Sequence, residues 1–297
     1  MRAWHAFGLC LFLATKVLAT PISTFVIFGD SLSDSGNSYE YSQHHIPAAP
    51  WYYQGRFSNG PIWTDYLLDA YFPQTRNQHI LSYAFGGAGV LQTKGKSFTL
   101  TQEVDSYLLG HSSSSAHHNL FIIWIGANDY LMDPHATLKK IEQVVKVIQQ
   151  NIERLLKHGA TQFMILSLPD LGGLPFAQEL ELGPQLSQIT EQHNHLLKEM
   201  VHTMHERYPR VDWVYVDAHQ LWRDVMQHPE KYKLTRSKEA CMSILTESVQ
   251  TKKPDNSCVG HVFFDQFHPT TYIHDLLAQE MIVRLQHLDV RNISSKK

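Results

Sequence analysis

The sequence lacks several features that would point to common classes of protein. After residue 20, no apolar stretch is long enough to cross a membrane as a helix, so we expect a soluble mature chain. Acidic residues outnumber basic residues, 28 against 25, and a nucleic-acid partner, which would want a basic face, is not expected. The 19 histidines show no metal-ligand spacing such as HExxH, so we expect neither a metal nor a cofactor.

The N-terminus has the composition of a secretory signal peptide. Arg2 precedes a short apolar stretch from Ala6 to Ala14, and small residues follow at Val17 and Ala19. Cleavage after Ala19 would remove residues 1–19 and leave 278 of the 297 residues as one α/β domain, residues 20–297. The expected location is extracellular, with the periplasm as an alternative. A buried N-terminal helix is the other interpretation of this stretch.

Cysteine is scarce. Of the three cysteines, Cys10 lies in the predicted signal peptide, and Cys241 and Cys258 remain. An even number of cysteines in an exported protein indicates a disulfide, here closing a loop of 16 intervening residues. Constraining such a loop is worth about 3 kcal/mol in the chain-entropy model. Two free thiols are the alternative.

Five short apolar runs indicate strands. Continuous apolar runs are typical of strands that are buried on both faces, as in a parallel sheet. The runs are Thr24 to Phe28, Ile80 to Phe85, Leu120 to Ile125, Gln162 to Leu168 and Trp213 to Val216.

Helical patterns separate these strands. Apolar residues recur at helical spacing from Leu138 to His158, from Leu186 to Tyr208, and from Thr270 to about Leu288. Gly159 follows the first pattern as a C-terminal stop. Strands that alternate with helices predict an α/β fold with a mainly parallel sheet.

Small polar groups follow three of the predicted strands. They are Asp30-Ser31, Gly86-Gly87 and Asn128-Asp129. Each pair alone could form an ordinary turn, because Gly, Asn, Asp and Ser favour turns. Ligands of open parallel sheets bind beyond the carboxyl ends of the strands, so three such pairs at matching ends indicate a functional site.

A serine at such an edge becomes a nucleophile only if an oriented base takes its proton. His268 suits this role, because Asp265 precedes it by three residues and one turn can hold both side chains on the same side. The alternative is a helix start with Asp265 or Thr270 as its cap. The G-x-S-x-G elbow of other hydrolases is absent.

Four short blocks in order resemble the GDSL, or SGNH, family of esterases and lipases. They read GDSLSDSGN, FGGAG, IGAND and DQFHP, and the resemblance runs from Phe25 to about Pro269. The run GRFSNGPIWTDYL, residues 55 to 67, is similar to the lipase-type branch, which includes secreted phospholipases, lysophospholipases and glycerophospholipid:cholesterol acyltransferases. The resemblance implies a three-layer α/β/α sandwich of flavodoxin-like character with a five-stranded, mainly parallel sheet.

The resemblance also implies a role for each matching residue. Ser31 would be the nucleophile, His268 the general base and then the acid, and Asp265 the residue that orients His268. The backbone N–H groups of Ser31 and Gly87 and the side-chain amide of Asn128 would form the oxyanion hole.

The lipase-type resemblance implies an acyl ester of a phospholipid, and best a lysophospholipid, at a membrane or micelle surface. An acyl-enzyme could also pass its acyl group to another alcohol such as a sterol. Residues 39–54 and 171–185 are rich in aromatic, Pro and Leu residues, which suits either an acyl groove or plain surface loops. One alternative is an esterase for short-chain or acetylated-sugar esters, and a remote one is a catalytically dead binding protein.

The loop closed by Cys241 and Cys258 ends seven residues before Asp265. A tied loop beside the catalytic turn suits a lid. In related acyltransferases a protease cuts a loop of this kind and raises activity, which implies an activating protease as a partner here. The alternative is a staple that firms the Asp265–His268 segment.

Overall fold

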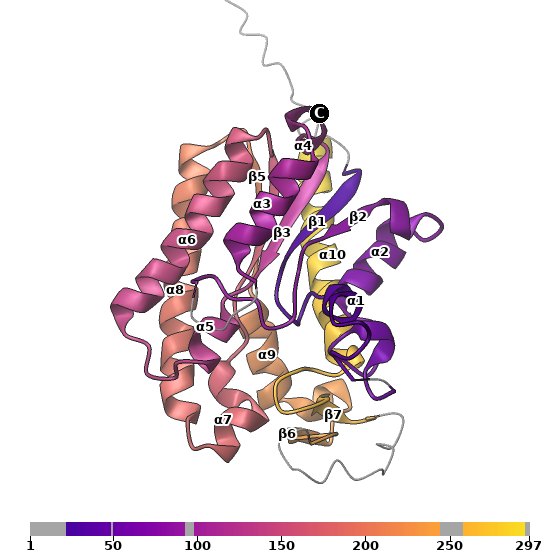
Figure 1. Ribbon diagram of the computed structural model, residues 1–297, viewed down its shortest axis with the longest axis vertical. Coiled ribbons are helices and arrows are strands. Elements are labelled where there is room, and N and C mark those ends of the chain that lie inside the picture. The colour runs from indigo at the N-terminus through magenta and orange to yellow at the C-terminus, as the bar shows by residue number, and fades with distance from the viewer. Residues whose placement is uncertain (1–21, 49, 93–97, 244–257, 295–297) are drawn as a thin grey trace, which may run out of the picture.

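The computed structural model describes residues 22–48, 50–92, 98–243 and 258–294, and a five-stranded parallel sheet lies at its centre (Figure 1). The strand order β2-β1-β3-β4-β5 is that of flavodoxin-like folds. The strands are β1 (Thr24–Gly29), β2 (Ile80–Ser82), β3 (Asn119–Trp124), β4 (Gln162–Leu166) and β5 (Asp212–Val216). The predicted fold class is therefore confirmed.

Alternation along the buried strands divides the core into two halves. In β1, Val26 and Phe28 face one half, whereas Phe25 and Ile27 face the other. Every residue of β3 is buried, as the continuous apolar run predicts. A sheet that is apolar on both faces needs a helical layer on each side.

The helices supply these two layers (Figure 1). One half of the core packs against α2 (Trp63–Tyr71) and α10 (Thr271–Ser294). The other half packs against α3 (Leu100–Gly110), α6 (Leu138–Lys157) and α8 (Gly183–Arg207). The shorter helices are α1 (Asn37–Tyr41), α4 (Ser113–Ala116), α5 (Ala127–Leu131), α7 (Pro175–Glu179) and α9 (Ala218–Gln227).

Predicted and observed elements differ mainly at their ends. Strand β2 ends at Ser82, three residues before the predicted end, and Gly86-Gly87 lie in the loop beyond it. The three predicted helices correspond to α6, α8 and α10, and Thr137 caps α6 through its side-chain oxygen. A second sheet, which no sequence pattern predicted, pairs β6 (Arg236–Ala240) with β7 (His261–Phe263) in parallel.

A disulfide joins Cys241 to Cys258 beside this second sheet, with 5.7 Å between the two Cα atoms. Cys241 directly follows β6, and Cys258 lies just before β7. The loop residues between 244 and 257 lie outside the described residues, as do residues 1–19 of the predicted signal peptide. Within the described part of the chain, no helix is both long and apolar enough to span a bilayer.

Candidate active site

The polar run after β1 folds into a turn around the buried carboxylate of Asp34. Its Oδ1 accepts the backbone N–H groups of Gly36 and Asn37 at 2.8 and 2.7 Å. Its Oδ2 accepts the N–H groups of Ser38 and Gly86 at 3.1 and 2.9 Å. Asp34 therefore organises its own turn and ties that turn to the second block, and Ser31 lies at the carboxyl end of β1.

The structure brings Ser31 and His268 together, although 237 positions separate them in the chain. The Oγ atom of Ser31 lies 2.8 Å from Nε2 of His268. The Nδ1 atom of the same ring lies 2.9 and 2.8 Å from the two carboxylate oxygens of Asp265. The three side chains thus form one hydrogen-bonded chain from carboxylate to imidazole to hydroxyl.

Local hydrogen bonds fix the carboxylate of Asp265, which is fully buried. Its Oδ1 accepts the backbone N–H groups of Phe267 and His268, both at 2.8 Å. Burial alone would raise the pKa of this carboxyl. The neighbouring His268 ring, the Tyr52 hydroxyl and the Phe267 N–H outweigh burial and hold the pKa of Asp265 below its ordinary value. Asp265 is therefore ionised at neutral pH and can orient the ring.

Candidate donors for an oxyanion lie in the same pocket as Ser31. Asn128 and Gly87 line the same pocket as Ser31 and His268. One side-chain N–H of Asn128 donates to the Ala88 carbonyl at 2.9 Å, and a primary amide has a second N–H to offer. Gly87 has a φ of +77°, which favours glycine.

Gly86 and Gly87 differ in what their N–H groups bond. The N–H of Gly86 donates to Asp34 and to Ser38 Oγ at 2.9 and 2.8 Å. Within the described residues, the N–H of Gly87 has no protein acceptor. This difference favours Gly87 as the backbone donor.

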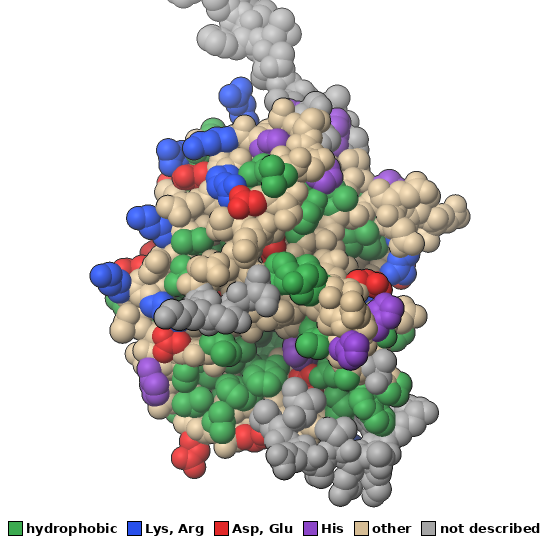
Figure 2. Space-filling view, viewed as in Figure 1, with side chains coloured by type: hydrophobic (Ala, Val, Ile, Leu, Met, Phe, Trp, Pro, Cys, Tyr) green, Lys and Arg blue, Asp and Glu red, His purple; other side chains and the backbone are tan. Residues whose placement is uncertain are grey.

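A pocket of about 290 Å³ opens beside this cluster. Its polar end holds Asp30, Ser31, Asn128 and His268. Its apolar walls come from several segments: Leu32, Phe57, Leu131, Met132, Pro169, Leu171, Leu174, Phe176, Trp222, Phe267 and Pro269. Figure 2 shows hydrophobic side chains gathered around a hollow in the lower half of this face, over α5 and α7.

Sequence reasoning anticipated part of this wall. Leu171, Leu174 and Phe176 come from the segment 171–185, whereas no described residue of the segment 39–54 lines the pocket. Tyr52, in the segment 39–54, instead donates a hydrogen bond to Asp265 at 2.6 Å. No sequence pattern predicted this contact. Trp222 in α9 was also missed, because its helix was not predicted.

A chain of Ser, His and Asp beyond the carboxyl edge of a flavodoxin-like sheet defines the SGNH class of ester hydrolases. The model of the GDSL-like Lipase/Acylhydrolase family matches residues 25–281, so the chain belongs to this family. The resemblance predicted from the four blocks is therefore confirmed.

The relatives include several bacterial proteins. The chain is 27% identical to the phosphatidylcholine-sterol acyltransferase of Aeromonas hydrophila, covering 86% of this chain and 88% of that protein. It is 29% identical to the secreted effector protein SseJ of Salmonella typhimurium and 25% identical to the thermolabile hemolysin of Vibrio parahaemolyticus. Those matches cover 86% and 88% of this chain but only 62% and 63% of the relatives' lengths.

Solved structures support the fold. A carbohydrate acetylesterase from Sinorhizobium meliloti matches 89% of this chain and 99% of its own with a TM-score of 0.53 at 14% identity. An aryl esterase from M. smegmatis matches 90% of this chain and 99% of its own, also at 0.53, with 15% identity. At such identities the likeness shows the fold alone.

Proposed function

We propose that this protein is a serine esterase that hydrolyses acyl esters of glycerophospholipids, with lysophospholipid as the favoured substrate. The observation that carries the proposal is the hydrogen bond of 2.8 Å between Ser31 and His268 at the polar end of an apolar pocket. An activated hydroxyl beside an apolar pocket suits an ester whose acyl group is a hydrocarbon chain.

The geometry supports an acyl-enzyme mechanism. Ser31 Oγ attacks the ester carbon while Nε2 of His268 takes the hydroxyl proton, and the carbonyl oxygen becomes an oxyanion. The N–H groups of Ser31 and Gly87 and the Asn128 amide receive that charge. The tetrahedral intermediate expels the leaving alcohol, which takes the proton from His268. Water, activated by the same ring, then releases the fatty acid.

The pocket favours a long acyl chain over an acetyl group. Its walls are almost entirely apolar, and about 290 Å³ is far more than an acetyl group needs. Met132 lines the pocket and is 75% exposed, so apolar surface continues from the pocket to solvent. Exposed apolar surface near a site suits contact with a membrane or micelle, which we propose as the setting of the reaction.

The experiment that tests the substrate compares fatty-acid release from lysophosphatidylcholine, a diacyl phospholipid and a short soluble ester. We expect release mainly from the lysolipid, because the apolar pocket beside Ser31 suits one acyl chain. Turnover of the short ester alone would favour the alternative, an esterase for short-chain or acetylated-sugar esters. A fluorophosphonate probe that fails to label Ser31 would favour the catalytically dead binding protein.

Acyl transfer to a sterol is a second candidate outcome of the same acyl-enzyme. The relative from Aeromonas hydrophila is named for this transfer. Adding cholesterol to the phospholipid assay and measuring cholesteryl ester beside free fatty acid separates transfer from hydrolysis.

We also propose that the protein is exported, and protein recovered from outside the cell is expected to begin at Thr20.

We further propose that a protease activates the enzyme by cutting the disulfide loop, residues 241–258. The start of this loop is hydrogen-bonded to the two residues that flank Asp265. Met242 N–H donates to the Phe264 carbonyl at 2.7 Å, and Gln266 Nε2 donates to Ser243 Oγ at 2.8 Å. A cut in the loop can therefore change the access to the pocket while the disulfide keeps both ends in place.

Limited proteolysis within the loop is expected to raise the rate on lipids severalfold and to leave the rate on a short soluble ester nearly unchanged. The control is the same treatment of Ser31→Ala, which reports any activity contributed by the protease. An unchanged rate on every lipid after complete cutting would contradict the lid and favour a staple.

A further inference from the structure

The carboxylate of Asp265 has a donor that lies outside its own turn. The hydroxyl of Tyr52 donates to Oδ2 of Asp265 at 2.6 Å, across 213 positions of sequence. Oδ1 receives two backbone N–H groups and lies 2.9 Å from the His268 ring, whereas Oδ2, among the described residues, receives the ring and Tyr52. Tyr52 is therefore the one donor to Oδ2, among the described residues, besides the ring that Asp265 orients.

Aromatic packing holds the Tyr52 ring in place. It packs edge-to-face with Phe264 at 5.2 Å and with Phe57 at 6.1 Å between ring centroids. Phe57 in turn packs against the ring of His268 at 5.2 Å. Burial, then the neighbouring Asp265 carboxylate, raise the pKa of the Tyr52 phenol far above its ordinary value. The phenol therefore stays protonated, and remains a donor, at any pH where the enzyme works.

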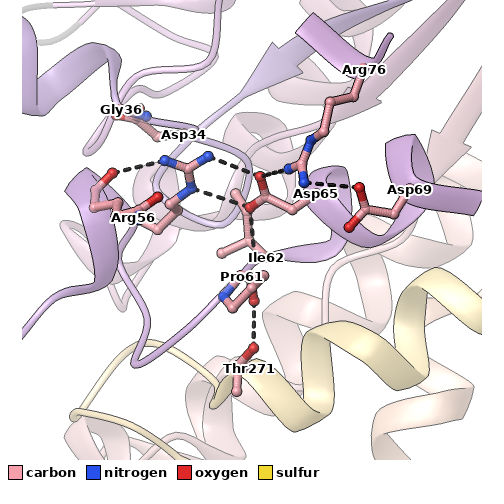
Figure 3. A network of polar contacts seen from close by, with 10 residues as sticks. Asp34, Gly36, Arg56, Pro61, Ile62, Asp65, Asp69, Arg76 and Thr271 are labelled. Carbon is pink, nitrogen blue, oxygen red and sulfur yellow. Dashed lines mark hydrogen bonds and ion pairs between the residues drawn. The ribbon is translucent and has the colours of Figure 1, made fainter. Parts of the chain in front are cut away.

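The segment Arg56–Asp65, which follows Tyr52, docks on the residues just after His268. Ser58 Oγ donates to the Pro269 carbonyl at 3.0 Å, and Thr271 N–H donates to Asn59 Oδ1 at 2.9 Å. Thr271 Oγ1 donates to the Pro61 carbonyl at 2.7 Å, as Figure 3 shows. This contact is close: a Cβ added to Gly60 would lie 2.7 Å from the Thr271 side chain.

Two arginines form ion pairs with Asp65, the last residue of this docking segment (Figure 3). Arg56 pairs with Asp65 at 2.9 Å, and Arg76 pairs with Asp65 at 2.7 Å and with Asp69 at 2.8 Å. Asp65 Oδ2 also accepts the N–H of Ile62 at 3.0 Å. The run GRFSNGPIWTD thus packs against the start of α10, and Tyr52, which precedes the run, lies against the Asp265 carboxylate.

We propose that Tyr52 is a positioning residue of the active site, which fixes the carboxylate of Asp265 and lowers its attraction for the protonated His268 ring. The inference rests on the proposed esterase function, in which His268 must be neutral to accept the proton of Ser31. A donor on Oδ2 withdraws negative charge from the carboxylate. A carboxylate with less negative charge attracts the protonated ring less strongly.

Tyr52→Phe tests the proposal, with Tyr53→Phe as the matched control. The phenylalanine keeps the ring packing and removes only the hydroxyl. Tyr53 is the adjacent tyrosine, 36% exposed, with the Arg56 guanidinium 6.0 Å from its ring centroid. We expect Tyr52→Phe to lower kcat/KM on a soluble ester by roughly threefold to thirtyfold, and Tyr53→Phe to leave it unchanged.

The pH profile distinguishes positioning from a merely structural role. In Tyr52→Phe, the acid limb of kcat/KM should move upward by roughly half to one pH unit, because Asp265 now favours the protonated ring more strongly. The downfield proton NMR signal of the ring N–H between His268 and Asp265 should shift in the same variant and stay unchanged in Tyr53→Phe. If neither the acid limb of kcat/KM nor the ring N–H signal shifted in Tyr52→Phe, the proposal would be overturned.

The NMR signal also separates this inference from the proposed function. It reports the His268–Asp265 hydrogen bond whether or not the enzyme turns over an ester. If the fluorophosphonate probe did not label the wild-type protein, the esterase function would be refuted. A signal that responds to Tyr52→Phe in that protein would still support the positioning role.

Discussion

Ser31→Ala is expected to lower the rate of ester hydrolysis by about 10⁴-fold or more. In the proposed mechanism this hydroxyl forms the acyl-enzyme, and its position 2.8 Å from His268 Nε2 allows the ring to take its proton. The oxyanion donors and the pocket remain, so a small residual rate above water alone is expected. The measurement is fatty-acid release together with labelling by a fluorophosphonate probe, which should disappear.

Ser33→Ala is the matched control for this substitution. Ser33 is buried two residues further along, and its hydroxyl has no partner among the described residues. Removing it leaves the Ser31–His268 contact untouched, so activity and labelling should stay near the wild-type level. If Ser31→Ala kept activity within tenfold of the wild type while folded, Ser31 could not be the nucleophile.

Asn128→Ala is expected to lower kcat by about 10²-fold to 10³-fold, which corresponds to about 2.7–4 kcal/mol of transition-state stabilisation. The amide meets negative charge only when the oxyanion forms, so KM should change little. The substitution also removes the donor to the Ala88 carbonyl, which should cost about 1 kcal/mol of folding free energy. Steady-state kinetics and thermal unfolding measure the two effects separately.

Asn128→Asp sharpens the same test. The side chain keeps its size, but it replaces a donor by a negative charge that faces the developing oxyanion, so activity should fall at least as far as in the alanine variant. Wild-type kcat in folded Asn128→Ala would remove Asn128 from the mechanism.

Sequence patterns predicted the central sheet well because its strands are buried on both faces. A run such as LFIIWI leaves few alternatives to a buried strand, and β3 occupies nearly the same residues, Asn119–Trp124. Strand β6 was missed because Arg236–Ala240 reads RSKEA and is largely exposed. Its strand character comes from pairing with β7, a contact that its own residues do not encode.

In the candidate site, too, contacts between residues near in sequence could be predicted, whereas contacts between residues far apart in sequence could not. Asp265 and His268 lie three residues apart, so their contact follows from the geometry of one turn, and the structure shows that contact. Tyr52 and Asp265 are 213 positions apart, and no spacing rule relates them. The GRFSNG run identified the branch of the family, but only the folded chain shows that its residues meet the start of α10.

The distance of 237 positions between Ser31 and His268 has a consequence for the order of events during synthesis. Ser31, the proposed nucleophile, leaves the ribosome 237 residues before His268, the proposed base. Contacts between such distant residues also form slowly, because a long loop must close first. An unfinished chain therefore carries a serine without a base. We infer that the proposed esterase activity begins only after His268 has been synthesised and has folded against Ser31.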